Sequence, residues 1–199
     1  MLVQGIKSRP VYDGLIIDPQ AKRHIFALEG EGALALLERA ISPEILERSE
    51  ILYTSGASRE HPHFPALSAL GADQCWQAPS IETLLFRLRG SLTNATMGTR
   101  LYVSGTEGFI GQAMGLGIEF GMDYRSIPAE HRGSLARRVQ CVHCKGITED
   151  VRTSPFRCSH CGLSLLVRDH YSRRLAAFQG VNIDAEEPGT APEPEELFS

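Results

Sequence analysis

Four of the five cysteines lie in two Cys-x-x-Cys pairs, and this pattern is the part of the chain best suited to chemistry. The first pair is Cys141 and Cys144, and the second is Cys158 and Cys161. A Cys-x-x-Cys turn places two thiolates on one side of a metal ion, so two turns supply the four soft ligands of a tetrahedral site. The repeated spacing predicts a four-cysteine metal ribbon and argues against a disulfide framework.

All four positions of such a site are filled by protein, which leaves none for a catalytic water. A closed site is normally structural, so we expect one zinc ion. Iron in the same cage is the alternative, because ligand type alone does not separate the two metals, and it would make a rubredoxin-like electron carrier. His143 and His160, inside the pairs, are possible substitute ligands that we expect to be exposed. Gly146 and Gly162 follow the pairs, where a knuckle turn needs positive φ.

The overall composition narrows the class of protein. Hydrophobic residues make up 42% of the chain and charged residues 22%, as in a globular protein with a sizeable core. The net charge of −4 and the lack of a basic, aromatic-rich stripe argue against nucleic acid as a partner. The sequence contains no signal-like apolar region and no membrane span. We therefore expect a cytoplasmic protein with no membrane partner.

Residues 24–133 alternate short β-rich runs with helical patterns, which predicts a doubly wound, parallel α/β domain. The expected strands are His24–Leu28, Ile51–Thr54, Gln74–Gln77, Arg100–Ser104 and Tyr124–Ile127. The expected helices are Ala33–Ala40, Pro65–Leu70, Ile81–Arg89 and Glu107–Phe120.

Three other regions complete the expected organisation. Residues 1–23 form an N-terminal arm. Residues 134–182 form the small zinc-ribbon or rubredoxin-like β domain and a helix after it, since Tyr171, Leu175 and Phe178 follow at helical spacing. That helix has two possible packing partners, another subunit or its own domain. Residues 183–199 are rich in Glu and Pro and are expected to be a disordered acidic tail.

Two stretches resemble the NAD(P)H domain of ferredoxin reductases. Leu101–Phe109 with the small-residue helix after it resembles the last third of that domain, and Tyr53–Glu60 is similar to its second strand and adenosine-ribose loop. This resemblance implies nucleotide-binding candidates, which are Gly30, Gly32, Ser58, Arg59, Ser104 and Gly105. The alternatives are that the glycines only make tight turns and that Arg59 faces solvent.

The sequence departs from that family where a nucleotide would bind. A dinucleotide site needs a glycine-rich first turn that lets the pyrophosphate approach backbone N–H groups. Here Glu29 and Glu31 flank the turn glycines and would face a dianionic phosphate. The segment before His24 is also too short for a flavin-binding barrel, and no plant-type iron–sulfur motif is present. We expect those cofactors on other chains.

The α/β domain, the ribbon and the continuation Arg168–Gly180 together resemble the small-subunit family of bacterial dimethylamine monooxygenases. This resemblance implies an accessory or electron-relaying subunit of a complex that oxidatively demethylates dimethylamine. NADPH, FMN, an iron–sulfur cluster and haem would lie mainly on partners, which are the reductase and haem-containing subunits. The alternative is a free-standing NAD(P)H-binding or redox-sensing protein with a structural zinc ribbon. No catalytic residue is assigned to the chain itself.

Overall fold

The structure is a computed structural model that describes residues 8–56 and 63–198. The chain divides into two compact units, each with its own hydrophobic core. The α/β unit is Tyr12–Gly133, and the β unit comprises the described parts of Met1–Val11 and Ser134–Ser199. None of the helices in the described ranges is both long enough and apolar enough to span a bilayer.

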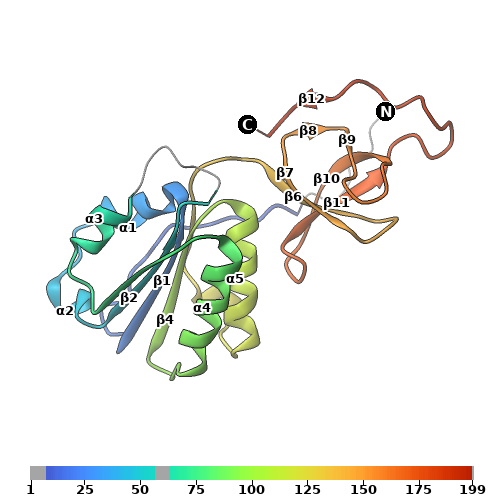
Figure 1. Cartoon of the computed structure of the whole chain (residues 1–199). Coiled ribbons are helices and arrows are strands. Elements are labelled where there is room, and N and C mark those ends of the chain that lie inside the picture. Colours follow the sequence, from blue (N-terminus) through green and yellow to red (C-terminus); the bar gives the residue numbers. More distant parts are fainter. Residues whose placement is uncertain (1–7, 57–62, 199) are drawn as a thin grey trace. The chain divides into compact units, whose positions relative to one another are not determined.

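The α/β unit is built on a five-stranded parallel sheet in the order β3-β2-β1-β4-β5 (Figure 1). Its strands are β1 (Arg23–Glu29), β2 (Ser49–Thr54), β3 (Gln74–Ala78), β4 (Thr99–Gly105) and β5 (Ala129–His131). Strands β1 and β2 are buried along nearly their whole length, as expected for central strands covered on both faces. The predicted doubly wound fold is confirmed.

Helices cover both faces of this sheet (Figure 1). Ile25 and Ala27 of β1 pack in the core beneath α4 (Ile81–Thr93) and α5 (Glu107–Glu119). Phe26 and Leu28 pack in the core beneath α1 (Leu34–Leu37) and α3 (Phe64–Ser68). Ser80 caps the start of helix α4, and its hydroxyl oxygen accepts a hydrogen bond from the backbone N–H of Thr83, the third residue of the helix. The helical segments are η1 (Gly30–Ala33), α1 (Leu34–Leu37), α2 (Pro43–Leu46), α3 (Phe64–Ser68), α4 (Ile81–Thr93), α5 (Glu107–Glu119) and η2 (Tyr124–Ser126).

The predicted last strand of this domain, Tyr124–Ile127, is wrong. Tyr124–Ser126 forms the 3₁₀ turn η2, because the Asp123 carboxylate accepts a 2.8 Å hydrogen bond from the backbone N–H of Arg125. Strand β5 follows after Pro128. The predicted helix Ala33–Ala40 is also shorter than expected, and α2 was not predicted.

Part of the expected N-terminal arm belongs to the α/β unit, which begins at Tyr12. Leu15 is buried in the core of this unit. The backbone N–H of Gly14 donates to the carbonyl of Ala129, and the N–H of Leu15 donates to the carboxylate of Glu130. These contacts fix the segment beside β5.

The β unit is a five-stranded mixed sheet in the order β7-β6-β11-β10-β9, with a separate two-stranded sheet of β8 and β12. In this sheet, β6 pairs antiparallel with β7 but parallel with β11. Its strands are β6 (Arg137–Cys141), β7 (Ile147–Val151), β8 (Thr153–Ser154), β9 (Phe156–Arg157), β10 (Ser164–Ser172), β11 (Ala177–Asn182) and β12 (Glu195–Glu196).

The helix predicted after the ribbon is wrong, because the segment forms the hairpin of β10 and β11. Tyr171 and Phe178 are paired across the two strands, and their rings meet edge to face with centroids 5.1 Å apart. Ala176 turns the chain with a φ of 50°. The two aromatic residues, whose spacing also suits one face of a helix, therefore pack together on one face of a hairpin.

The expected disorder of the acidic tail is wrong at its end. Strand β12 pairs with β8, and Phe198 is 8% exposed. The guanidinium carbon of Arg137 lies 4.0 Å from the ring centre of Phe198 and 4.1 Å from that of Phe178. A cation held between two aromatic rings ties the tail to the β unit.

Candidate functional site

The four cysteines of the two Cys-x-x-Cys pairs come together in the β unit. Their Sγ atoms all lie within 4.8 Å of one another. The Sγ atoms of Cys141 and Cys161 are 3.9 Å apart, and those of Cys144 and Cys158 are 3.7 Å apart. A tetrahedral ion with metal–sulfur bonds of about 2.3 Å needs sulfurs about 3.8 Å apart. The cage therefore fits a single tetrahedral metal ion.

The two turns that carry the cysteines are built alike. In the first, Cys141 donates its N–H to the Gly146 carbonyl at 2.9 Å and accepts from the Lys145 N–H at 3.0 Å. In the second, Cys158 makes the same two bonds, with Leu163 at 2.9 Å and Gly162 at 3.0 Å. This repeated backbone geometry holds each pair of thiols facing the other pair.

The prediction that both glycines supply positive φ is right for only one turn. Gly162 has a φ of 75°, but in the first turn Lys145 takes that position with a φ of 65°. Gly146 is needed for a different reason, since a Cβ there would lie 2.4 Å from the ring of His160. His160 is exposed and its Nε2 lies 2.8 Å from the Ile147 carbonyl, so the histidine braces one turn against the other.

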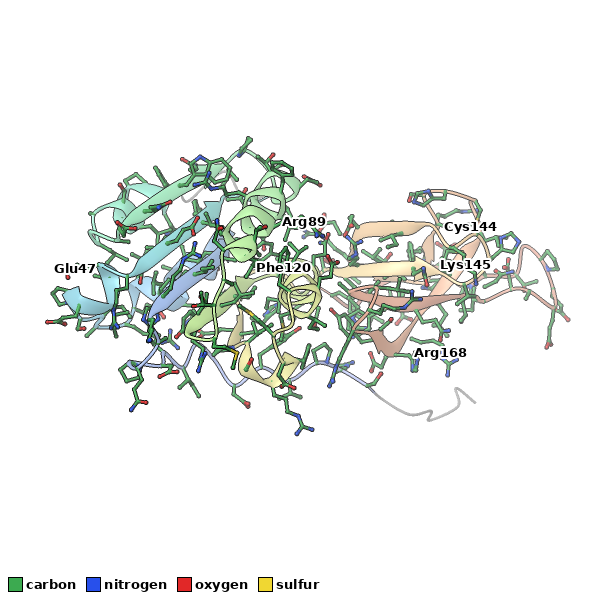
Figure 2. All side chains as sticks on the ribbon, turned by 90° about the horizontal axis from the view of Figure 1, so that it is seen from below. Glu47, Arg89, Phe120, Cys144, Lys145 and Arg168 are labelled. Carbon is green, nitrogen blue, oxygen red and sulfur yellow. The ribbon has the colours of Figure 1, made fainter. Side chains whose placement is uncertain are left out.

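The first turn rests on the sheet beneath it. Cys141 ends β6 and is paired with Gly180 of β11, and the Val142 N–H donates to the Gly180 carbonyl. A Cβ on Gly180 would lie 2.9 Å from the Val139 side chain, so a larger residue here would have to displace that side chain. Figure 2 shows Cys144 and Lys145 beyond the end of β6.

The pKa shifts of two of the thiols indicate that the cage favours a bound cation. Burial raises the pKa of Cys158, but hydrogen bonds from the backbone N–H groups of Cys161 and His160 and from neighbouring thiols lower it to about 6. The Leu163 N–H lowers the pKa of Cys161, but burial and hydrogen bonds with the other thiols raise it to about 12. Closely spaced thiols cannot all ionise alone, whereas a dication stabilises all four thiolates.

The nucleotide-binding candidates lie elsewhere, at the carboxyl end of the parallel sheet. Gly30 begins the turn after β1 with a φ of 54°, and Gly32 packs against the backbone of Ser104 and Gly105 in β4. The Ser104 hydroxyl is buried and donates to the Glu130 carbonyl at 2.7 Å. Ser58 and Arg59 lie outside the described residues.

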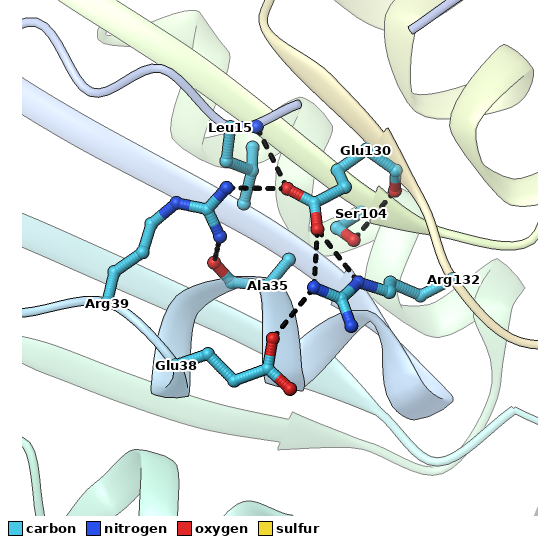
Figure 3. Close-up of polar contacts among 7 residues, drawn as sticks. All are labelled: Leu15, Ala35, Glu38, Arg39, Ser104, Glu130 and Arg132. Carbon is cyan, nitrogen blue, oxygen red and sulfur yellow. Dashed lines mark hydrogen bonds and ion pairs between the residues drawn. The ribbon is translucent and has the colours of Figure 1, made fainter. Parts of the chain in front are cut away.

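A charged network that the sequence did not reveal lies beside these candidates (Figure 3). Glu130 accepts hydrogen bonds from Arg39 at 2.7 Å, from Arg132 at 2.8 Å and from the Leu15 N–H at 3.1 Å. Burial raises the pKa of Glu130, but these three donors outweigh it and lower the pKa. Arg132 also pairs with Glu38. The partners are far apart in sequence, so no spacing pattern announces them.

Comparison with protein families gives two matches that together span both units. Residues 4–127 match the N-terminal domain of dimethylamine monooxygenase subunit DmmA-like proteins. Residues 138–181 match the C-terminal domain of the same proteins. The delta subunit of heme-dependent oxidative N-demethylase from Ectopseudomonas mendocina (strain ymp) is 34% identical over 110 residues, 55% of this chain. That match spans 63% of the delta subunit, less than two thirds of its length.

Solved structures with a related arrangement are more distant. A phthalate dioxygenase reductase aligns with a TM-score of 0.46 and 14% identity, over 68% of this chain and 46% of its own. A type IV self-sufficient cytochrome P450 monooxygenase aligns with a TM-score of 0.46 and 19% identity, over 69% of this chain and 20% of its own.

Proposed function

This chain belongs to the dimethylamine monooxygenase subunit DmmA-like family, and we propose that it is an accessory or electron-relaying subunit of an NADPH-dependent, multicomponent haem monooxygenase. The complex would oxidatively demethylate dimethylamine. The observation that carries this proposal is the family match across both units. The 34% identity to a subunit described as part of a heme-dependent oxidative N-demethylase supports it.

The cofactors of the reaction are proposed to lie on the reductase and haem-containing partners. Among the described residues, the four-cysteine cage is the one group of three or more His, Cys, Asp or Glu side chains placed to hold a metal ion. A single metal ion bound by four thiolates has no open position for oxygen or an amine. We propose that other chains supply haem, FMN and the iron–sulfur cluster.

We propose zinc as the ion bound by Cys141, Cys144, Cys158 and Cys161, with iron as the alternative. Zinc would make the β unit a structural clip, because it has no redox chemistry. Iron in the same cage would exchange single electrons and make this chain a relay between reductase and haem subunits. In both cases the residues of the cage hold the ion, and the small core of the β unit depends on it.

Metal analysis with a visible absorption spectrum on the purified full chain separates the two roles. One zinc per chain and no colour would support the accessory role, whereas one iron with thiolate-to-metal charge-transfer bands would support the relay. Cys144→Ser should lose the metal, and Cys75→Ser, a cysteine outside the cage, should keep it. A metal-free wild-type protein that folds and stays metal-free when zinc or iron is added would contradict the metal proposal.

Association with partners tests the subunit role itself. Co-expression with the reductase and haem-containing subunits should give one complex that survives size-exclusion chromatography and oxidises dimethylamine with NADPH. Full assembly and full activity without this chain would overturn the proposal. A well-dispersed single chain that binds NADPH tightly and ignores those subunits would favour the free-standing NAD(P)H-binding or redox-sensing alternative.

A further inference from the structure

The end of the sheet where a dinucleotide would enter is defined by the strand order. In the order β3-β2-β1-β4-β5, the chain adds β2 and β3 on one side of β1 and then crosses to the other side to add β4 and β5. The switch point therefore lies between β1 and β4. Doubly wound folds bind their ligands outside the carboxyl ends of the strands at this switch point. Here those two ends are Glu29 of β1 and Gly105 of β4, so the contacts of these residues decide whether the crevice is open.

The side chain of Glu29 fills this position. Glu29 is only 6% exposed, and its Oε2 accepts a 2.8 Å hydrogen bond from the backbone N–H of Thr106, the residue that precedes α5. A Cβ on Gly105 would lie 2.7 Å from Oε2, and a Cβ on Gly56 would lie 2.3 Å from Oε1. Both neighbouring turns are therefore fitted closely around the carboxylate.

The turn after β1 is packed tightly against β4 at Gly32. A Cβ on Gly32 would lie 2.2 Å from the Ser104 carbonyl oxygen and 2.7 Å from the Gly105 N. The glycine thus brings two stretches of backbone together, instead of bringing backbone to a ligand. Helix α1 after this turn has only four residues, too few to provide the aligned N–H groups that hold a pyrophosphate.

We propose that the Glu29 carboxylate is an internal anion that occupies the place of a dinucleotide phosphate, so that the α/β unit does not bind NAD(P)H. The Thr106 N–H already has its acceptor, and a phosphate entering the crevice would meet a like charge. Among residues 8–56 and 63–198, no salt bridge to Glu29 neutralises that charge. This inference does not depend on the role of the cage or on the partner subunits.

Titration of the full chain with NADPH and NADH is the direct test. Isothermal calorimetry and nicotinamide fluorescence should detect no binding up to about 1 mM, the upper end of ordinary substrate affinities. Saturable binding of either nucleotide by the wild-type chain at lower concentrations, with competition by ADP-ribose, would overturn the inference.

Variants of Glu29 test the internal anion itself. Glu29→Ala removes the acceptor of the Thr106 N–H, so the exchange of that amide proton should become about tenfold faster. Adding acetate or inorganic phosphate should partly restore the protection and raise the melting temperature of this variant. Glu29→Gln keeps an acceptor and should keep the protection. Glu31→Ala changes an exposed glutamate in the same turn and should behave as wild type.

The opposite pattern would contradict the role of Glu29. If Glu29→Ala left the exchange of the Thr106 amide unchanged, the carboxylate would not hold the end of α5. If the melting temperature of Glu31→Ala responded to acetate or phosphate as strongly as that of Glu29→Ala, the anion effect would not arise in the crevice.

Discussion

The two units solve the same problem, the stabilisation of charge at a set of backbone turns, in opposite ways. In the β unit, matched turns gather four thiols, and we propose that a metal ion from outside the chain stabilises them as thiolates. In the α/β unit, a turn and a helix end that could receive an anion receive one from Glu29. On these two proposals, the β unit needs a ligand from outside the chain, and the α/β unit supplies its own. A site that a fold leads one to expect therefore has to be judged from the side chains that already fill it.

Removing the metal should give the largest difference between the units. Apparent binding free energies of structural zinc are on the order of 10 kcal/mol. The small hydrophobic core of the β unit cannot supply that much folding free energy on its own. Chelation, or Cys141→Ser, should unfold the β unit and leave the α/β unit folded. Hydrogen exchange at Val139 and Ile25 reports on the two units separately. Simultaneous loss of protection at both positions would show that the units are not independent.

A core substitution in the α/β unit should do the reverse. Phe109 is 1% exposed, so Phe109→Ala should destabilise this unit by about 3–5 kcal/mol in urea unfolding. Metal affinity, measured by competition with a chelator, should not change. Phe86→Ala is the control, because Phe86 is 79% exposed and its loss should cost little. A fall in metal affinity with Phe109→Ala would mean that the α/β core supports the cage.

Acid should affect the units in sequence. Protonation of the thiolates should release the metal first, because cysteine binds a metal as the thiolate and its affinity falls as the pH falls. The α/β unit responds later through Glu130, whose pKa is lowered below its ordinary value of 4.5. Its ionised carboxylate therefore stabilises the fold above that value, and this contribution is lost as the pH falls through the lower, folded-state pKa.

Glu130→Gln should accordingly lower the free energy of unfolding by about 1–2 kcal/mol at pH 7, and the difference from wild type should shrink as the pH falls below 4.5. Urea unfolding at several pH values measures this difference. Glu119→Gln removes a more exposed ion pair with Arg89 and should cost less than about 1 kcal/mol at any pH. If Glu130→Gln lowered the free energy of unfolding by the same amount at every pH, the effect would come from altered packing and not from the lost charge.

The smallest effects should come from the two matched turns of the cage. Lys145 and Gly162 share the left-handed backbone position, which costs a residue with a Cβ about 1 kcal/mol. Lys145→Gly should therefore stabilise the metal-bound β unit by up to about 1 kcal/mol, and Gly162→Ala should destabilise it by about the same amount. Chelator competition followed by circular dichroism resolves both. If both variants changed the stability in the same direction and by the same amount, residues 145 and 162 would not hold equivalent positions in the two turns.

The structural elements that could be predicted from the sequence are those that depend on a local pattern of residues. The strands around Phe26 and Leu52 were visible because buried parallel strands are continuously apolar, and the cage was visible because ligand spacing is local. Tyr124–Ile127 was misread because its β-forming residues outweighed the turn made by Asp123. The spacing of Tyr171 and Phe178 suits both a helix and a hairpin, so it did not decide between them.

The contacts that complete each site were not accessible to the same reasoning. Glu29 was visible as an unfavourable charge, but its hydrogen bond to Thr106 depends on bringing β1 beside β4. Similarly, the need for glycine at position 146 comes from the His160 ring in the opposite turn, and not from the backbone angle that sequence reasoning assigned to it. Such contacts depend on the tertiary fold, which local spacing does not encode.

The parallel pairing of β6 with β11 also sets the order in which the chain can mature during synthesis. Tyr12–Gly133 leaves the ribosome before any cysteine of the cage, so the α/β unit can fold while the rest is still being made. All four cysteines emerge by residue 161, yet Cys141 lacks its strand partner until Gly180 has followed. The newborn chain thus carries a full set of thiols before their support exists, and we expect secure metal loading only after Gly180 has been made.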